Sequence, residues 1–257
     1  TNGSGADAAY LKNTPIEITE TEVPIQFTRY GLLPDSGGPG RWRGGLATVM
    51  EFKVFAPNSR ITVRNRDRSI FRPWGTLGGL SAETSNFIIN PGAAGERILG
   101  NTDIAIAEPG DVIHIHSPGG GGRGCPLERE PERVRLDVER GYVGLAAAKA
   151  RYGVVITDGV VDAEATAALR AEMRKDVNTT HFHYGPERDA FERLWTAENY
   201  DALTRLLAAL PVHWRFFVKT KLFAAMREAE NGGDVEAAFT AVRRDYPQVP
   251  EVLQAAE

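Results

Sequence analysis

Residues 117–126 read Ser-Pro-Gly-Gly-Gly-Gly-Arg-Gly-Cys-Pro and separate two halves of the chain that differ in pattern. Of the 27 glycines, 20 lie before residue 128, whereas apolar residues after that point recur at helical spacing. Consecutive glycines lack the Cβ atoms that restrict the backbone, so this segment can turn sharply and approach another segment closely. The stretch therefore marks the change from a β-rich region to a helical one.

The first half is expected to be a glycine-rich, mainly antiparallel β structure of the sandwich or barrel kind. Alternating and β-branched runs, separated by Gly, Pro, Asn and Ser, predict extended segments at 15–30, 46–55, 60–66, 86–89 and 111–116. Pro24 would place the first of these at an edge or a bend.

The second half is expected to be helical. Pro131 suits a first helical turn, Gly141 can close that helix in the left-handed conformation, and Asp162 can cap a later helix. Apolar or alanine-rich spacing predicts further helices at 144–151, 187–195, 197–210, 212–230 and 235–246. The predicted fold class is α+β, with a β-rich glycine-motif domain at 1–128 and a helical region at 129–257 that contains one short strand near 153–157.

Composition narrows the class of partner. The formal net charge of -4 arises from basic and acidic residues spread along the chain, so no basic stripe favours nucleic acid. No apolar run reaches the roughly 20 residues of a membrane span, and no secretory leader opens the sequence, so a cytoplasmic location is expected. The polar start at Thr1 suggests a cut or a gap in a longer polypeptide.

The four glycines Gly119, Gly120, Gly121 and Gly122 allow two interpretations. Their backbone N–H groups could bind an anion, or the segment could be a tight structural crossover or a close subunit contact. The spacing lacks the Gly-Lys-Ser/Thr ending of a phosphate loop and the pattern of a dinucleotide fingerprint. The sequence favours the crossover.

Arginines accompany two other glycine motifs. In residues 34–45, Arg41 and Arg43 could hold carboxylates or tie neighbouring strands together. On a strand, Arg64, Arg66 and Arg68 would share one face and Asn65 and Asp67 the other, so one face could meet an anionic substrate or an acidic partner. The candidate substrate contacts are Arg64, Arg66 and Asp67. A solvated edge or an internal salt-bridge network explains them as well.

Histidine, cysteine and threonine residues could also act as metal ligands or nucleophiles, and each has an ordinary structural explanation. The pairs His114/His116 and His181/His183 could bind a transition metal from one strand face or be ordinary strand histidines. Cys125, the only cysteine, and a free Thr1 could act as nucleophiles, or they could be a turn residue and a chain boundary. The sequence assigns no metal ligand and no catalytic residue.

A series of motifs resembles the carboxy-terminal part of the hydantoinase B/oxoprolinase family. The motifs cover roughly residues 13–157, and the helical tail beyond Asp162 is less familiar. Many family members carry Tyr and Asp where this chain has Arg123 and Cys125, so a role for that Asp does not carry over. The motifs are Asn13-Thr-Pro-Ile-Glu17, Pro34-Asp-Ser-Gly-Gly38, Arg41-Trp-Arg-Gly-Gly45, Arg64-Asn-Arg-Asp67, Pro73 to Gly79, Asn90-Pro-Gly92, Pro109-Gly-Asp111, Gly119-Gly-Gly-Gly122, Pro126-Leu-Glu-Arg-Glu-Pro131, Asp137-Val138, Gly141-Tyr-Val143 and Tyr152-Gly-Val-Val-Ile156.

The resemblance implies part of an ATP-dependent enzyme that opens small cyclic amides such as hydantoins, 5-oxoproline or other lactams. It implies a hetero-oligomer with a hydantoinase A-type subunit that carries ATP and Mg²⁺. A divalent metal is expected in the amino-terminal half of the hydantoinase B-type subunit, and none on this chain. Two alternatives stay open: a subunit of an ATP-dependent ketone carboxylase, and a non-catalytic scaffold that supports assembly.

Overall fold

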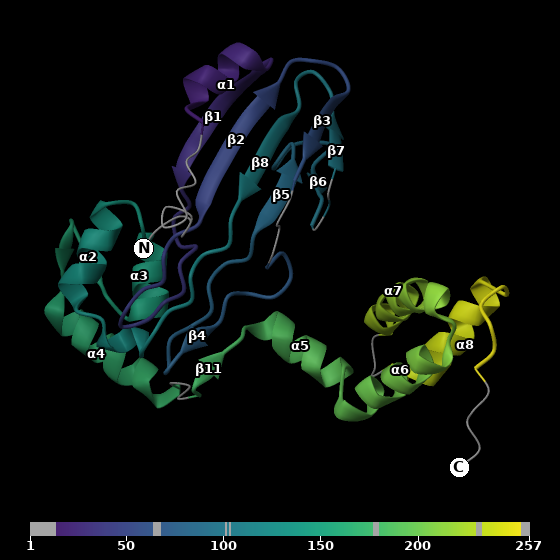
Figure 1. Ribbon diagram of the computed structural model, residues 1–257. Coiled ribbons are helices and arrows are strands. Elements are labelled where there is room, and N and C mark those ends of the chain that lie inside the picture. The colour runs from purple at the N-terminus through teal and green to yellow at the C-terminus, as the bar shows by residue number, and fades with distance from the viewer. Residues whose placement is uncertain are drawn as a thin grey trace. The chain divides into compact units, whose positions relative to one another are not determined.

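The computed structural model describes residues 14–63, 68–100, 102, 104–176, 180–229 and 233–252. The chain forms two compact units, residues 1–187 and residues 188–257. The change of pattern expected at residue 128 is a change of secondary structure inside the first unit, and the boundary between the units follows Glu187. The predicted α+β class, with antiparallel strands first and helices after them, is confirmed (Figure 1).

The main layer of the first unit is a five-stranded antiparallel sheet (Figure 1). Its register pairs Phe27 with Phe52 and Phe52 with Ile113, so residues of three strands meet on one face. In spatial order the strands are β1 (Ile25–Leu32), β2 (Thr48–Val54), β8 (Val112–His116), β5 (Asn86–Ile89) and β6 (Arg97–Ile98).

A two-stranded ribbon, β3 (Ser59–Thr62) with β7 (Ile104–Ala107), contributes to the core on one face of this sheet. Alternate residues of β7 point inward, where Ala105 and Ala107 join Phe87 and other buried side chains of the sheet in one cluster. The small alanine side chains let the ribbon approach the sheet closely.

Residues 16–22 differ from the predicted extended chain, because Ile16–Glu22 forms the helix α1 and only the following residues form β1. Pro15 suits the start of a helix and Glu17 lies in its first turn, where the helix dipole favours an acidic residue. Pro24 disfavours helical geometry at the residue before it, so Val23 is extended and the helix ends there. None of the residues of α1 is buried.

After the glycine stretch, the first unit adds a helical layer. The short 3₁₀ helix η2 (Pro126–Glu128) leads into α2 (Pro131–Glu139), α3 (Leu145–Tyr152) and α4 (Ala163–Met173), and η3 (Arg174–Asp176) follows α4. Between α3 and α4, β9 (Ile156–Thr157) and β10 (Val160–Val161) form a hairpin. As predicted, Gly141 adopts a positive φ after α2, and the Asp162 carboxylate accepts the Ala165 N–H at the start of α4.

A last strand pair closes the first unit. Strand β4 (Gly75–Thr76) pairs antiparallel with β11 (Phe182–His183), which follows the helical layer in the sequence. The pair therefore brings a segment after α4 back to the glycine-rich part of the first half.

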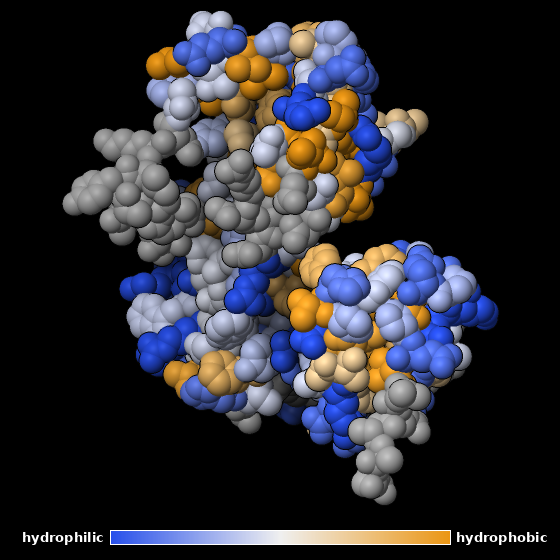
Figure 2. All heavy atoms as spheres, turned by 45° about the vertical axis from the view of Figure 1, so that its right-hand side comes forward, coloured by the Kyte–Doolittle hydropathy of each residue, from blue (hydrophilic) through white to orange (hydrophobic). Residues whose placement is uncertain are grey.

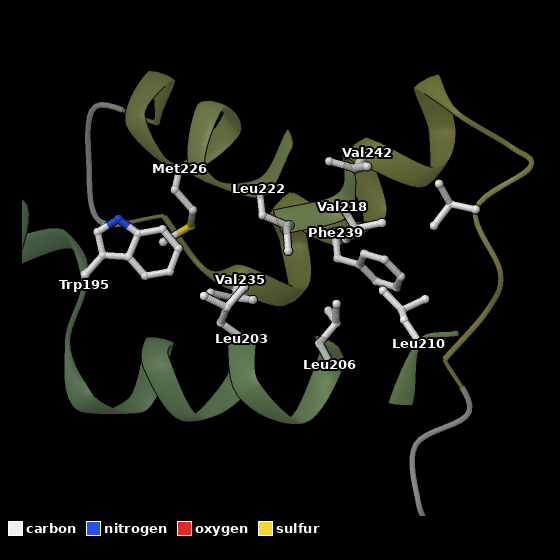
Figure 3. Close-up of a cluster of buried hydrophobic side chains, with 11 residues drawn as sticks. Trp195, Leu203, Leu206, Leu210, Val218, Leu222, Met226, Val235, Phe239 and Val242 are labelled. Carbon is white, nitrogen blue, oxygen red and sulfur yellow. The ribbon is translucent and has the colours of Figure 1, made fainter. Parts of the chain in front are cut away.

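The second unit is a small helical bundle with its own core (Figure 3). Leu222 and Met226 are fully buried, and the rings of Trp195 and Phe223 stack with centroids 4.3 Å apart. Its helices are α6 (Ala197–Ala209), α7 (Val212–Glu228) and α8 (Val235–Asp245), preceded by α5 (Pro186–Leu194), which begins at the end of the first unit.

Hydrophobic side chains also reach the surface of both units (Figure 2). In the first unit the outer face of the ribbon exposes Ile104 and Ile106, and the edge strand β6 exposes Ile98. Among the helices of the described residues, none combines the length and the apolar character that crossing a membrane requires.

Candidate functional site

Three glycine-rich segments of the first unit interlock through their backbones. They are residues 36–45, 73–83 and 117–124, and together we call them the glycine interlock. Gly120 makes two backbone hydrogen bonds with the first segment. Its carbonyl oxygen accepts the Gly38 N–H, and its own N–H donates to the Gly45 carbonyl oxygen, each at 2.8 Å. Gly122 donates to Leu80 at 3.0 Å, and Leu80 in turn donates to the first segment at 2.7 Å.

This close approach is possible only without side chains. A Cβ atom placed on Gly121 would lie 1.7 Å from the Trp74 carbonyl oxygen, and one on Gly44 would lie 1.7 Å from the Gly120 oxygen. A Cβ on Gly119 would lie 2.0 Å from the carbonyl oxygen of Ser36. Distances this short are hard overlaps, so glycine is required for steric reasons at these positions.

The interlock supports the crossover interpretation of Gly119 to Gly122. The N–H groups of Gly119, Gly120 and Gly122 already donate to the carbonyls of Glu83, Gly45 and Leu80. A backbone N–H that is used in this way is not available to bind a phosphate.

At its surface, the interlock arranges four residues from distant parts of the sequence in one row. Trp42 and Arg123 exchange both backbone hydrogen bonds at 2.9 and 3.0 Å, Arg123 bridges in parallel to Thr76, and Thr76 pairs with Phe182. Residues that pair across neighbouring strands place their side chains on the same face, about 5 Å apart. Trp42 is 53% exposed and Phe182 is 41% exposed, so this face meets solvent.

More aromatic and basic side chains continue this face. The Tyr184 ring lies 5.7 Å from Phe182 and 6.2 Å from Trp74, and the Arg68 guanidinium lies 4.7 Å above the Trp74 ring. The Arg41 guanidinium lies 5.9 Å from the Trp42 ring and 3.9 Å from the Glu128 carboxylate. We call the whole set the aromatic–arginine face: Arg41, Trp42, Arg68, Trp74, Arg123, Phe182 and Tyr184.

A buried ionic cluster fixes the first segment of the interlock to the helical layer. Arg43 of that segment and Arg129 both contact the Oδ2 atom of Asp137 in α2, at 3.3 and 2.9 Å. All three side chains are about nine-tenths buried. Burial raises the pKa of the neighbouring Tyr152 to about 12, so its phenol stays neutral.

The predicted substrate contacts Arg64, Arg66 and Asp67 lie outside the described residues, so their role stays a prediction. They come directly before Arg68, which belongs to the aromatic–arginine face. Sequence reasoning singled out Arg41 and Arg68 separately but did not bring the face together, because its members are separated by up to 143 positions in the chain. The tryptophans beside glycine runs were a further local signal.

The other candidate residues from the sequence include His181, His183, Cys125 and Thr1. His183 accepts the Ser81 N–H on Nδ1 at 3.1 Å, and the backbone of His181 accepts the Leu77 N–H. Cys125 is half-buried directly before η2. Within the described ranges, no three His, Cys, Asp or Glu side chains are arranged to hold a metal ion. Thr1 lies outside those ranges.

Residues 2–126 match the sequence model of the hydantoinase B/oxoprolinase family. The matched residues include all three segments of the glycine interlock. The resemblance inferred from the motifs is therefore confirmed.

Three relatives show how far the likeness extends. A protein of Pseudomonas sp. (strain NS671) that is named as the B component of a D-/L-hydantoinase is 34% identical over 63% of this chain and 28% of its own length. The crystal structure of ATP-dependent caprolactamase from Pseudomonas jessenii is 31% identical, with a TM-score of 0.51 over 63% of this chain and 28% of that one. The acetone carboxylase alpha subunit of Xanthobacter autotrophicus is 27% identical over 63% of this chain and 26% of its own.

The fold likeness reaches further than the sequence likeness. A nucleotide-free acetone carboxylase structure covers 95% of this chain and 34% of its own, at a TM-score of 0.53 and 21% identity, which shows a shared fold. The chain spans little more than a quarter of the length of the hydantoinase and caprolactamase chains that it matches.

Proposed function

We propose that this chain is part of an ATP-dependent hydrolase of small cyclic amides, such as a hydantoin, 5-oxoproline or another lactam. The observation that carries the proposal is the family match over residues 2–126, together with relatives named as a hydantoinase component and a caprolactamase. In this proposal ATP and Mg²⁺ bind to a hydantoinase A-type partner, and a divalent metal belongs to the amino-terminal half of the hydantoinase B-type polypeptide.

The contribution of this chain is a rigid platform. Backbone hydrogen bonds in the glycine interlock hold its three segments without flexible side chains, so the residues at its surface are pre-positioned. Exposed Trp, Tyr and Arg side chains are the residue types that contribute most to protein–protein binding. The aromatic–arginine face is therefore the surface that we assign to the partner.

The chemistry assigned to the complex is activation of an unreactive amide. Transfer of the terminal phosphoryl group of ATP to the amide oxygen would make the amide carbon more electrophilic. Water could then add to this carbon, the ring C–N bond would break with the nitrogen leaving as an amine, and hydrolysis of the resulting acyl phosphate by a second water would release phosphate. The predicted role of Arg64, Arg66 and Asp67 is contact with the substrate, since guanidinium groups bind anionic oxygens in two-pronged hydrogen bonds.

Reconstitution tests the proposal. The full-length protein that contains this chain is combined with its A-type partner, and ATP turnover is measured with a lactam and then with a ketone plus bicarbonate. Lactam-dependent turnover supports the hydrolase. Turnover only with ketone and bicarbonate would instead identify an ATP-dependent ketone carboxylase, the second candidate, which the acetone carboxylase relative favours.

Three variants separate binding from chemistry. Arg123→Glu should weaken partner binding at least tenfold, because a charge of the wrong sign enters the centre of the exposed row, whereas Arg60→Glu on the exposed part of β3 should not. Arg64→Ala combined with Arg66→Ala should lower turnover with partner binding intact. If variants of all non-glycine motif residues leave turnover unchanged, the chain is a non-catalytic scaffold.

A further inference from the structure

A chain of hydrogen-bonded titratable groups lies on the face of the five-stranded sheet opposite its core. Glu51 of β2 pairs in register with His114 of β8, and His116 follows two residues later on the same face. The His114 Nδ1 atom lies 3.2 Å from Glu51 Oε2, and His114 Nε2 lies 3.1 Å from His116 Nδ1. His116 Nε2 lies 3.1 Å from the Thr84 carbonyl oxygen, just before β5.

The contact with the Thr84 carbonyl, at the end of this series of hydrogen bonds, fixes which His116 nitrogen carries a hydrogen. A carbonyl oxygen only accepts hydrogen bonds, so His116 Nε2 carries a hydrogen and, in the neutral ring, Nδ1 is an acceptor. With His116 neutral, His114 Nε2 donates to His116 Nδ1. The other nitrogen of His114 then faces the carboxyl group of Glu51, and that contact is attractive only if a further proton lies between them.

The groups around Glu51 place that proton on His114. A β-bulge in β1 between Phe27 and Arg29 lets the Thr28 hydroxyl donate to Glu51 Oε1 at 2.9 Å. Burial raises the pKa of Glu51, but the hydrogen bonds from Thr28 and His114 and the charges of His114 and Arg29 outweigh it, so the pKa is lowered. Glu51 is thus ionised at neutral pH.

No other described charge on the neighbouring strands replaces Glu51 as the partner of His114. The next charged residue on this face of β2 is Lys53, whose ammonium lies 5.7 Å from the Phe55 ring. On β5, the residues in register with His114 and His116 are Ile88 and Asn86, which are uncharged. The side chains of His114 and Glu51 are 12% and 24% exposed, so solvent screens their contact only in part.

We propose that Glu51, His114 and His116 form a proton-dependent lock that joins β2, β8 and the segment before β5, and that the lock is complete only with one proton on His114. If His116 takes up a second proton, two N–H groups face each other between the rings. If His114 loses its proton, a lone pair must face either the carboxylate or the other ring. This device does not depend on the proposed enzymatic function.

The sign of the pH dependence follows from the two limits. Because the pKa of Glu51 is lowered in the folded state, its stabilising contribution is present above the unfolded value near 4.5 and is lost as the pH falls through the lower folded value. Without a proton on its Nδ1 atom, His114 presents a lone pair to the Glu51 carboxylate, so the contact between the two side chains is lost. The lock therefore needs both the ionised carboxylate of Glu51 and the proton on His114.

Histidine side-chain ¹⁵N NMR on the full chain tests the lock without any variant. At neutral pH we expect His114 to carry hydrogen on both ring nitrogens and His116 to carry it on Nε2 alone. A neutral His114, or a His116 protonated on Nδ1, would overturn the proposal.

The variant Glu51→Gln tests the same lock by stability. A glutamine amide can donate to a neutral His114 Nδ1, so the extra proton is no longer needed. Above roughly pH 6, where histidine ordinarily loses its proton, the unfolding midpoint of this variant should fall less with rising pH than that of the natural chain. The matched control Glu17→Gln, in the exposed helix α1, should keep the natural pH profile, and an unchanged profile in Glu51→Gln contradicts the lock.

Discussion

At the residue scale, the glycines of the first unit differ in what surrounds them. A Cβ atom on Gly121 or Gly44 would overlap a carbonyl oxygen of another segment, whereas one on Gly31 in β1 would have nothing within 4 Å. The same residue type therefore has a steric role at some positions and none at another. Glycine content alone does not reveal which positions matter.

Gly121→Ala should destabilise the first unit by about 3 kcal/mol or more, because the added methyl overlaps the Trp74 carbonyl and the backbone must move. Gly31→Ala is the matched control and should change the stability little, since its site is open and its backbone needs no positive φ. Urea unfolding of both variants measures the difference. Equal midpoints would show that the interlock can relax at low cost.

At the element scale, α2 is joined to the first segment of the interlock by charge, whereas its apolar side chains Val134 and Val138 pack within the helical layer. Asp137 of α2 is shared between Arg43 and Arg129, and the pair with Arg43 spans 94 residues. Among the described residues, one carboxylate compensates two buried guanidinium groups. The ionic link between this helix and the first segment therefore depends on a single side chain.

Asp137→Asn should lower the free energy of unfolding by about 3–5 kcal/mol, because it leaves two buried positive charges without a counter-ion. Glu132→Gln in the same helix serves as the control, since Glu132 is half exposed and pairs only with Arg135 and solvent. Denaturant unfolding monitored by circular dichroism gives both values. A small effect of Asp137→Asn would mean that water reaches the arginines.

At the scale of the whole molecule, each of the two units has a separate core. The sheet core contains Ile113, which is fully buried in the first unit, and the bundle core contains Leu222, which is fully buried in the second. Units with separate cores are expected to unfold in separate transitions.

Leu222→Ala should lower the stability of the second unit by about 2–5 kcal/mol through the cavity that it leaves. Ile113→Val should lower that of the first unit by about 1 kcal/mol. In scanning calorimetry, each substitution should move one transition and leave the other in place. A single transition that moves with either substitution would show that the units unfold together.

The sequence by itself determined the local structure and the family. Most of the predicted ranges match an observed strand or helix within a few residues, because periodicity, caps and turn residues act over short distances. The strands β4, β6, β7, β10 and β11 were not predicted. The main exception is α1, where alternating isoleucines indicated a strand although Pro15 and Pro24 delimit a short helix. Several of the motifs that carry the resemblance contain glycines at which a Cβ atom would overlap a neighbouring backbone, such as Gly44, Gly119 and Gly121.

Only the tertiary structure decided which of these local pieces meet. Nothing in the spacing of Trp42, Thr76, Arg123 and Phe182 places them in one row, and nothing places Glu51 beside two histidines of another strand. Such pairs depend on strand order and register, which are set by long-range packing of the whole unit. The glycines make close approach possible, and the fold selects the segments that approach.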